Sequence, residues 1–348
     1  MGALRAFDAA ANRAREGLRV VEDFVRFVLD DGHLTNQLKQ LRHELTTVVS
    51  LVPADALYAA RETQADVGAG LSSPGETSRT DASSVLAANF KLLQESLRSL
   101  EEFAKVLAPG ADGLLKQLRY RSYTLERAVQ ITATSLARLS TARLYVLIDG
   151  GATLEQFTTM AESLIRAGVH ILQLRDKRLD DRSLIERGRR LHELTRGTQT
   201  LFIMNDRPDL ATLTQADGVH VGQEELSVKD ARTIVGPAAL VGVSTHSLDQ
   251  ARRAVLDGAN YIGVGPTFPS ETKHFDRFTG AELLQEVARE IRLPAFAIGG
   301  IHRENLPLVL SSGITRVAVS GAITAADSPA EAARELLASL QKSEVRSG

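Results

Sequence analysis

Short apolar runs alternate with helical segments throughout the second half of the chain. Eight such runs follow residue 140, and most are separated by a helical segment that ends in Gly or Asp-Gly. The runs are residues 143–148, 170–174, 200–204, 218–221, 240–243, 261–264, 294–298 and 316–319. Apolar strands that alternate with helices predict a parallel sheet. Eight of these units in roughly 200 residues predict a closed (β/α)8 barrel, the TIM-barrel fold.

The first half of the chain shows helical periodicity instead. Apolar residues recur there at spacings of three and four, as one face of an amphipathic helix requires. They are Leu18, Val21, Val25, Val28 and Leu29 in one stretch, and Leu86, Phe90, Leu93, Leu97, Leu100, Phe103, Ala104 and Leu107 in another. Asp81 is the expected N-cap of the second helix and Pro109-Gly110 its end, and a third helix is expected from 114 to 139.

The change of pattern near residue 140 divides the chain. We expect an all-α helical domain over residues 1–139, followed by the α/β barrel over residues 140–348. The helical half also contains a polar, glycine-rich segment from Arg61 to Arg79. A loop of that length is uncommon inside a compact domain and is often functional.

Composition and charge narrow the classes of function. The 348 residues include no cysteine, which excludes disulfides, thiolate catalysis and zinc–thiolate sites. A net charge of −2 gives no reason to expect a nucleic-acid or membrane-surface partner. No stretch has the apolar length of a signal peptide or a bilayer span. We therefore expect a cytoplasmic enzyme acting on small molecules, and leave open whether it forms a homo-oligomer.

Charged residues follow several predicted strands, at the end of the barrel where this fold builds active sites. Asp206 follows the third strand and Glu225 the fourth, so their carboxylates could share one hard cation such as Mg2+. Acids in such loops otherwise form salt bridges or caps. Arg175, Lys177 and Lys273 face the same rim, which makes sense if a multiply charged anion binds between them. This set predicts a magnesium-dependent pyrophosphate site.

A second anion site is expected after strands seven and eight. Gly299-Gly300 and Ser320-Gly321 stand where this fold places a phosphate site made of backbone N–H groups. Glycine lets the backbone approach a ligand closely, and simple turn chemistry is the alternative explanation. Two anion sites on one rim imply a reaction that joins two phosphorylated molecules.

Residues 141 to 348, with all of these clusters, resemble the thiamine phosphate synthase family. The resemblance implies a transferase that couples hydroxymethylpyrimidine pyrophosphate to hydroxyethylthiazole phosphate and releases pyrophosphate. It implies a pyrimidine-pyrophosphate-binding segment made of Gln173, Leu174, Arg175, Asp176 and Lys177. It further implies that Asn205 contacts the pyrimidine and that Asp206 is the first magnesium ligand. Glu225 stands where the family usually has an aspartate as the second ligand.

The resemblance also gives roles to residues later in the chain. They are Ser244 and Lys273 as further ligands of the pyrimidine substrate, Ser270, Glu271 and Thr272 as the segment that meets the thiazole phosphate, and Gly300, Ser320 and Gly321 as its cradle. Arg175, Lys177 and Lys273 are the expected catalytic groups, because with Mg2+ they would neutralise the leaving pyrophosphate. His220 either contacts the pyrimidine or is a structural histidine of the barrel.

Two other interpretations share the barrel. A thiazole tautomerase has the thiazole phosphate site but tends to lose the pyrophosphate and metal groups. Arg175, Lys177, Asp206 and Lys273 therefore argue against it. A non-catalytic regulatory barrel would have no need to keep both anion sites. The fold alone does not separate these possibilities.

Residues 1 to about 135 resemble a helical domain assigned as a hydroxymethylpyrimidine phosphate kinase. The resemblance rests on residues 12–23, 61–68 and 99–103, and the sequence has no P-loop or protein-kinase signature. Phosphate-binding charges could come from one helix, with the loop after Arg61 closing over them. These charged residues are Arg13, Arg15, Glu16, Arg19 and Asp23. The alternative is a helical dimerisation or docking module.

Overall fold

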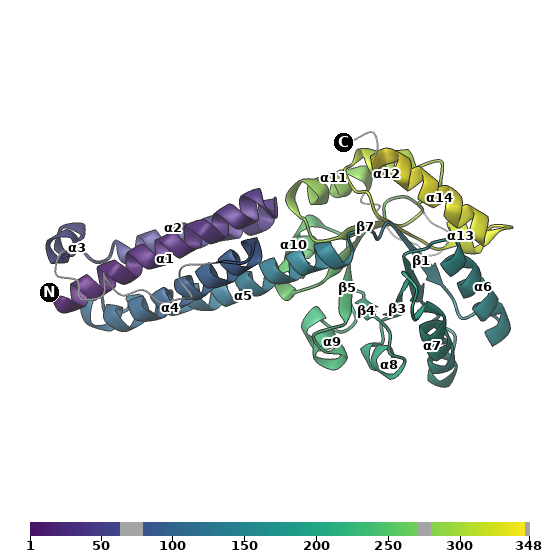
Figure 1. Cartoon of the computed structure of the whole chain (residues 1–348), viewed down its shortest axis with the longest axis horizontal. Helices are drawn as coiled ribbons and strands as arrows, with labels where there is room; N and C mark the ends of the chain where they lie inside the picture. Colours follow the sequence, from purple (N-terminus) through teal and green to yellow (C-terminus); the bar gives the residue numbers. More distant parts are fainter. Residues whose placement is uncertain (63–78, 270–279, 345–348) are drawn as a thin grey trace. The chain divides into compact units, whose positions relative to one another are not determined.

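The computed structural model describes residues 1–62, 79–269 and 280–344 (Figure 1). The chain divides into two compact units, Met1–Gln130 and Ile131–Gly348. Among the described residues the first unit contains only helices, and the second contains a closed barrel. The predicted fold class, an all-α region followed by an α/β barrel, is therefore confirmed. None of the described helices combines the length and apolar character that crossing a bilayer requires.

Long helices make up most of the first unit. The described helices are α1 (Gly2–Phe27), α2 (Gly32–Val49), α3 (Ala54–Ala60), α4 (Ala82–Leu107) and α5 (Ala111–Arg138), the last of which continues into the second unit. Asp81 caps α4 as predicted, because its carboxylate accepts a hydrogen bond from Ser84 N at 2.7 Å. Val28, which the apolar pattern placed on the buried face, is exposed instead, because α1 ends at Phe27.

Helix α1 packs against α4 through small and apolar residues. Gly17 permits the close approach, since a Cβ there would lie 2.9 Å from the backbone oxygen of Asn89. Two of the glutamates buried in this unit are paired with arginines. Arg42 Nε lies 2.9 Å from Glu22 Oε2, and Arg119 Nη2 lies 2.9 Å from Glu101 Oε2. Such pairing is what lets a carboxylate remain charged inside a helical core.

The second unit is a closed parallel barrel whose strands are in chain order, with β1 paired to β8. The strands are β1 (Leu144–Ile148), β2 (Ile171–Leu174), β3 (Leu201–Asn205), β4 (Gly218–Val221), β5 (Leu240–Thr245), β6 (Tyr261–Val264), β7 (Ala295–Ile298) and β8 (Val317–Val319). The helices are α6 (Leu154–Arg166), α7 (Asp181–Thr195), α8 (Pro208–Leu213), α9 (Val228–Val235), α10 (Leu248–Asp257), α11 (Gly280–Glu290), α12 (Leu306–Ser311), α13 (Gly321–Thr324) and α14 (Pro329–Glu344). Each predicted strand overlaps an observed one, so the TIM barrel is confirmed.

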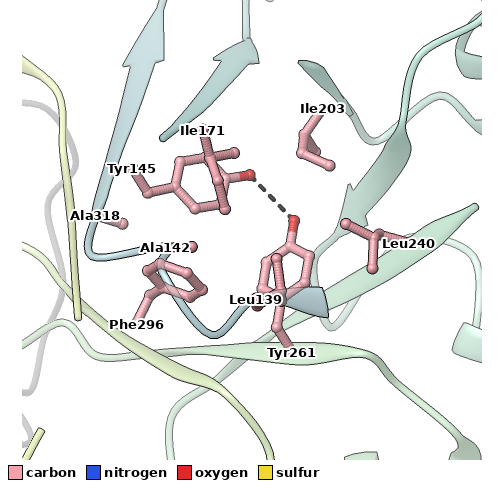
Figure 2. Packing of buried hydrophobic residues seen from close by; sticks show 9 residues of the cluster. All are labelled: Leu139, Ala142, Tyr145, Ile171, Ile203, Leu240, Tyr261, Phe296 and Ala318. Carbon is pink, nitrogen blue, oxygen red and sulfur yellow. Dashed lines mark hydrogen bonds between the residues drawn. The ribbon is translucent and has the colours of Figure 1, made fainter. Parts of the chain in front are cut away.

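A buried cluster fills the barrel toward the N-terminal ends of its strands (Figure 2). Its aromatic members meet edge to face, with ring centroids 5.4 Å apart for Tyr145 and Phe296 and 5.7 Å apart for Tyr261 and Phe296. Leu139, which directly follows α5, is completely buried in the same cluster. The cluster forms a packed floor beneath the opposite rim, where the polar loops lie.

Candidate functional site

Basic and acidic groups meet where β2 and β3 end. Lys177 Nζ lies 3.7 Å from Asp206 Oδ2, and Asn205 Nδ2 donates a hydrogen bond to the same oxygen at 2.6 Å. Asp206 has a φ of 58°, in the left-handed region that Asp and Asn tolerate better than most residues. Its backbone N–H donates to His220 O at 2.8 Å. This turn holds the Asp206 carboxylate at the rim.

Glu225 brings a second carboxylate close to Asp206. Burial raises the pKa of Asp206, the charge of Glu225 raises it further, and Lys177 and Arg175 act in the opposite direction. Gly222 makes room for the folded-back Glu225 side chain, because a Cβ at 222 would lie 2.1 Å from Glu225 Oε2. Two neighbouring carboxylates repel each other unless a cation lies between them, and their oxygens are ligands that suit a hard divalent cation.

The described residues offer this cation few other protein ligands. Within residues 1–62, 79–269 and 280–344, no group of three or more His, Asp or Glu side chains is arranged to hold a metal. Mg2+ is commonly bound by one or two carboxylates and keeps waters and substrate phosphate oxygens for the rest of its shell. Asp206 and Glu225 therefore suit magnesium, because two protein carboxylates can share its shell with water and phosphate oxygens.

His220, on β4, makes hydrogen bonds at both ring nitrogens. Its Nε2 lies 3.0 Å from Ser244 Oγ on β5, and its Nδ1 lies 3.3 Å from the Tyr261 hydroxyl on β6. Burial lowers the pKa of His220 to about 4, and the charge of Arg175 acts in the same direction. The imidazole is therefore neutral near pH 7. The predicted residues His220 and Ser244 belong to one polar cluster next to the charged groups.

The cluster continues through two tyrosines that the sequence analysis did not identify. The Tyr145 hydroxyl lies 3.1 Å from that of Tyr261 and accepts a hydrogen bond from Gln173 Nε2 at 2.8 Å. A dashed line marks the contact between the two hydroxyls in Figure 2. Gln173 is 2% exposed, and its Oε1 has no hydrogen-bond partner among the described residues. Gly242 was the available signal, because it is paired in register with His220 and with Tyr261. A glycine between two large residues on neighbouring strands indicates that one of their rings lies over the glycine, and here this is the ring of Tyr261.

Two members of the predicted pyrimidine-pyrophosphate segment have side chains engaged elsewhere. Leu174 is 1% exposed, so its side chain belongs to the core. The Asp176 carboxylate accepts hydrogen bonds from Gly150 N at 3.1 Å and Arg178 N at 2.8 Å. Burial alone would raise the pKa of Asp176, but the hydrogen bonds from Arg178 and Gly150 lower it to about 2. These two side chains shape the β2–α7 loop, and a contact of either residue with the substrate stays a prediction.

Glycine at the predicted phosphate cradle has a clear conformational cause. Gly299 and Gly300 have φ values of 99° and 62°. A Cβ at Gly300 would lie 2.3 Å from the backbone oxygen of Pro269. Ser320 Oγ donates to Leu147 O at 3.1 Å, and open space lies beside Gly321. Turn geometry explains the glycines, so a phosphate-binding role for Gly300, Ser320 and Gly321 stays a prediction.

Four predicted site residues lie outside the described part of the chain. They are Ser270, Glu271, Thr272 and Lys273. They belong to the connection from β6 to α11, which begins at the same rim as the loop that carries Asp206. Their contacts with substrate stay predictions.

Known proteins are similar to both parts of the chain. A family profile described as thiamine monophosphate synthase matches residues 144–323, and one described as the ThiD2 family matches residues 5–128. The chain is 44% identical to a thiamine-phosphate synthase of Rhodopirellula baltica over 333 residues, which cover 93% of this chain and 89% of that relative. It is 41% identical to a thiamine-phosphate synthase of Gloeobacter violaceus, with 94% and 93% covered.

The barrel also has a relative of known structure. Thiamine phosphate pyrophosphorylase from Pyrococcus furiosus is 31% identical, with a TM-score of 0.53, over 58% of this chain and 96% of that one. The bacterial relatives, by contrast, match over nearly the whole chain, so that similarity extends through both units. The chain belongs to the thiamine-phosphate synthase family.

Proposed function

We propose that the barrel transfers a hydroxymethylpyrimidine group from its pyrophosphate to the ring nitrogen of hydroxyethylthiazole phosphate, a step of thiamine biosynthesis. The observation that carries this proposal is the convergence of Arg175 and Lys177 on the carboxylates of Asp206 and Glu225. A pyrophosphate bound together with a divalent cation would satisfy both sets of charges at once. Family membership supplies the identity of the two substrates.

The chemistry needs stabilisation of a leaving group more than acid–base catalysis. The C–O bond between the pyrimidine methylene and pyrophosphate breaks, and its electron pair leaves with the pyrophosphate. The thiazole nitrogen supplies the pair for the new C–N bond, while the aminopyrimidine ring spreads the positive charge. Arg175 and Lys177, together with Lys273, would act by neutralising the developing charge on the leaving group.

Asp206 and Glu225 would hold the magnesium ion. When bound, the ion supplies Lewis-acid stabilisation to the pyrophosphate oxygens. The raised pKa of Asp206 supports this role, because burial and the nearby Glu225 charge disfavour a free carboxylate there. Glutamate is one methylene longer than the aspartate usual at position 225, and the space above Gly222 lets it fold back toward Asp206.

The same groups favour a synthase over a thiazole tautomerase. A tautomerase needs the thiazole phosphate cradle but has no pyrophosphate to neutralise. Lys177 is nevertheless held 3.7 Å from Asp206, and a second acid lies beside them. We propose that Gly300, Ser320 and Gly321 bind the thiazole phosphate through backbone N–H groups, and that Ser270, Glu271 and Thr272 complete its site.

A magnesium titration of the full chain tests the metal assignment together with the activity. With both substrates present, the wild-type protein should form thiamine phosphate, detected by mass spectrometry, only when magnesium is added. Glu225→Asp should remain active, because the charge is kept. Glu225→Ala should need at least roughly ten-fold more magnesium than the wild type to reach the same activity. Loss of a group that positions a metal typically has an effect of this size.

Glu224→Ala is the matched control, because it removes the same charge from an exposed neighbouring position. Its magnesium dependence should equal that of the wild type. An unchanged titration for Glu225→Ala would remove Glu225 from the metal site. Absence of product from the wild-type protein with saturating magnesium would contradict the synthase assignment itself.

We further propose that the helical unit phosphorylates hydroxymethylpyrimidine phosphate and so produces the pyrophosphate that the barrel consumes. The ThiD2 match over residues 5–128 and the resemblance described above support this activity. The start of the 61–79 segment contacts α1 near the N-terminal end of the helix. Arg61 Nη2 lies 2.8 Å from Asp8 Oδ1, and Arg5 Nη2 donates to Glu62 O at 2.6 Å. Cationic groups near such a segment suit phosphoryl transfer, which depends on positioning and charge stabilisation.

The full chain, supplied with ATP, magnesium and hydroxymethylpyrimidine phosphate, should form the corresponding pyrophosphate. Arg15→Ala should lose this activity, because it removes a partly exposed cation from α1. Arg26→Ala, on the same helix, should not, because Arg26 lies over the Phe27 ring at the far end of α1. A protein that neither binds ATP nor turns over, but self-associates, would leave the helical unit as a dimerisation module.

A further inference from the structure

A single line of hydrogen bonds crosses the barrel interior from β2 to β5. It starts at Gln173 Nε2, 2.8 Å from the Tyr145 hydroxyl, and continues 3.1 Å to the Tyr261 hydroxyl. It then reaches His220 Nδ1 at 3.3 Å and leaves from His220 Nε2 to Ser244 Oγ at 3.0 Å. Figure 2 shows the two tyrosine hydroxyls pointing at each other inside the core. Both tyrosines are buried, so these links are shielded from solvent.

The line has a direction, because its first member can only donate. An amide nitrogen accepts no hydrogen bond, so the Tyr145 oxygen accepts. The Tyr145 hydrogen would be a buried unpaired donor unless it is given to the Tyr261 oxygen, and this requirement makes Tyr145 the donor. By the same requirement, the Tyr261 hydrogen goes to His220 Nδ1, the other hydrogen-bond partner of that hydroxyl. A ring nitrogen that accepts carries no hydrogen, so the neutral imidazole bears its proton on Nε2. His220 therefore donates to Ser244, and the Ser244 hydrogen remains available to another acceptor.

We propose that Tyr145 and Tyr261 are positioning residues that hold His220 as the Nε2–H tautomer and so aim the Ser244 hydroxyl hydrogen at an acceptor atom of the pyrimidine pyrophosphate. The proposal rests on the proposed function, since Ser244 meets that substrate only if the barrel is the synthase. It adds a basis for specificity. The site would favour a ligand that presents an acceptor to Ser244 and would disfavour one that presents a donor.

The opposite direction would follow if the Gln173 amide were turned by half a rotation. Every donor in the line would then reverse, and Ser244 would donate to His220, leaving only lone pairs for the ligand. The observed orientation leaves the buried Gln173 Oε1 without a partner among the described residues. The turned amide would instead leave both N–H groups without one, and buried orphan N–H groups are rarer than under-satisfied carbonyl oxygens.

Nitrogen-15 NMR of the full chain with labelled histidine tests the direction without any assay of activity. The spectrum distinguishes protonated from unprotonated ring nitrogens, and His220→Gln identifies the signals of His220 among those of the 8 histidines. The wild-type protein should show the Nε2–H tautomer at neutral pH. Tyr261→Phe and Tyr145→Phe should show mixed tautomers, because each removes one link. Tyr123→Phe, which changes an exposed tyrosine of α5, should match the wild type.

Kinetics then connect the tautomer to the substrate. Tyr261→Phe should lower kcat/KM for the pyrimidine pyrophosphate by roughly ten- to a hundred-fold, the scale of losing a group that orients a ligand-binding residue. The KM for thiazole phosphate should stay unchanged. Ser244→Ala combined with Tyr261→Phe should lose little more than Ser244→Ala alone, because both substitutions remove one interaction.

An Nδ1–H tautomer in the wild-type protein would overturn the proposal. So would tyrosine variants that are less stable yet keep the wild-type tautomer and kinetics, because the tyrosines would then serve packing alone. Failure of the proposed function looks different. The wild-type protein would form no thiamine phosphate, although its His220 spectrum still showed the Nε2–H form.

Discussion

Asp206→Asn should lower kcat/KM for thiamine phosphate formation by about two to three orders of magnitude, the scale of removing a central charge-stabilising group. The amide has the size of the carboxylate but lacks the charge that would hold magnesium beside Glu225. Asparagine is the better replacement, because alanine would be strained at a φ of 58°. Steady-state kinetics at saturating magnesium, with circular dichroism to confirm folding, provide the measurement. Wild-type turnover by a folded variant would exclude Asp206 from the mechanism.

The same substitution should stabilise the protein when magnesium is absent. The pKa of Asp206 is raised in the folded state, first by burial and then by Glu225, so the folded protein binds this proton more tightly than the unfolded chain does. Ionised Asp206 therefore lowers the free energy of unfolding at every pH above its raised pKa. Asp206→Asn should raise the urea midpoint at neutral pH in metal-free buffer.

Asp176→Asn is the control of opposite sign. The pKa of Asp176 is lowered to about 2 by hydrogen bonds from Arg178 and Gly150, which outweigh the effect of burial. Its ionised form therefore stabilises the fold above the unfolded pKa, and the amide should lower the urea midpoint at neutral pH. Urea midpoints that move in the same direction in both variants would contradict this account. They would show that the local partners of each carboxylate do not decide whether its charge stabilises the fold.

Gly242→Ala should destabilise the barrel and disconnect His220 from Tyr261. A Cβ at Gly242 would lie 2.0 Å from Tyr261 Cζ and 2.5 Å from its hydroxyl oxygen. Neither side can yield easily, because Tyr261 is packed among buried rings and Gly242 is part of β5. Overpacking of this kind costs typically 1–3 kcal/mol of unfolding free energy. Urea denaturation measures that cost, and the His220 tautomer reports whether the hydroxyl has moved.

Gly263→Ala is the matched control for stability. It adds the same methyl group to the neighbouring strand β6, but its Cβ would lie 3.5 Å from His220 Cε1, an ordinary contact. Its urea midpoint should stay close to that of the wild type. Equal losses from the two variants would mean that any methyl group inside the barrel is disruptive, and that Gly242 has no particular relation to Tyr261.

Much of the fold could be predicted because it depends on local periodicity. The runs at 261–264 and 218–221 coincide with β6 and β4, and repeated strand–helix units leave little choice but a parallel barrel. The error at Val28 has a local cause as well. Periodicity continued past Phe27, where α1 ends, and the next glycine, Gly32, comes only at the start of α2.

The candidate site was only partly predictable. Some of its residues follow a strand, which neighbouring residues reveal, whereas others are joined by contacts between residues far apart in the sequence. Asp206 and Glu225 were found from their positions after strands, a feature that neighbouring residues define. The path from Gln173 through Tyr145 and Tyr261 joins residues up to 116 positions apart in a single contact, and it exists only once the barrel closes. Asp176 shows the opposite problem. Its place in a charged segment after β2 gave no sign that backbone N–H groups would donate hydrogen bonds to its carboxylate oxygens.

The last turns of α5 have a consequence for how a gene encoding this protein can be divided. Ser135 Oγ accepts a hydrogen bond at 3.0 Å from Asn260 Nδ2, next to β6, and Leu139 is 0% exposed within the barrel floor. A coding sequence split at residue 140 would place both residues in the helical fragment. The separate barrel would then lack a side chain that fills its core at the N-terminal ends of the strands. Evolutionary fission into two separate polypeptides would therefore have to duplicate this stretch of helix or replace it.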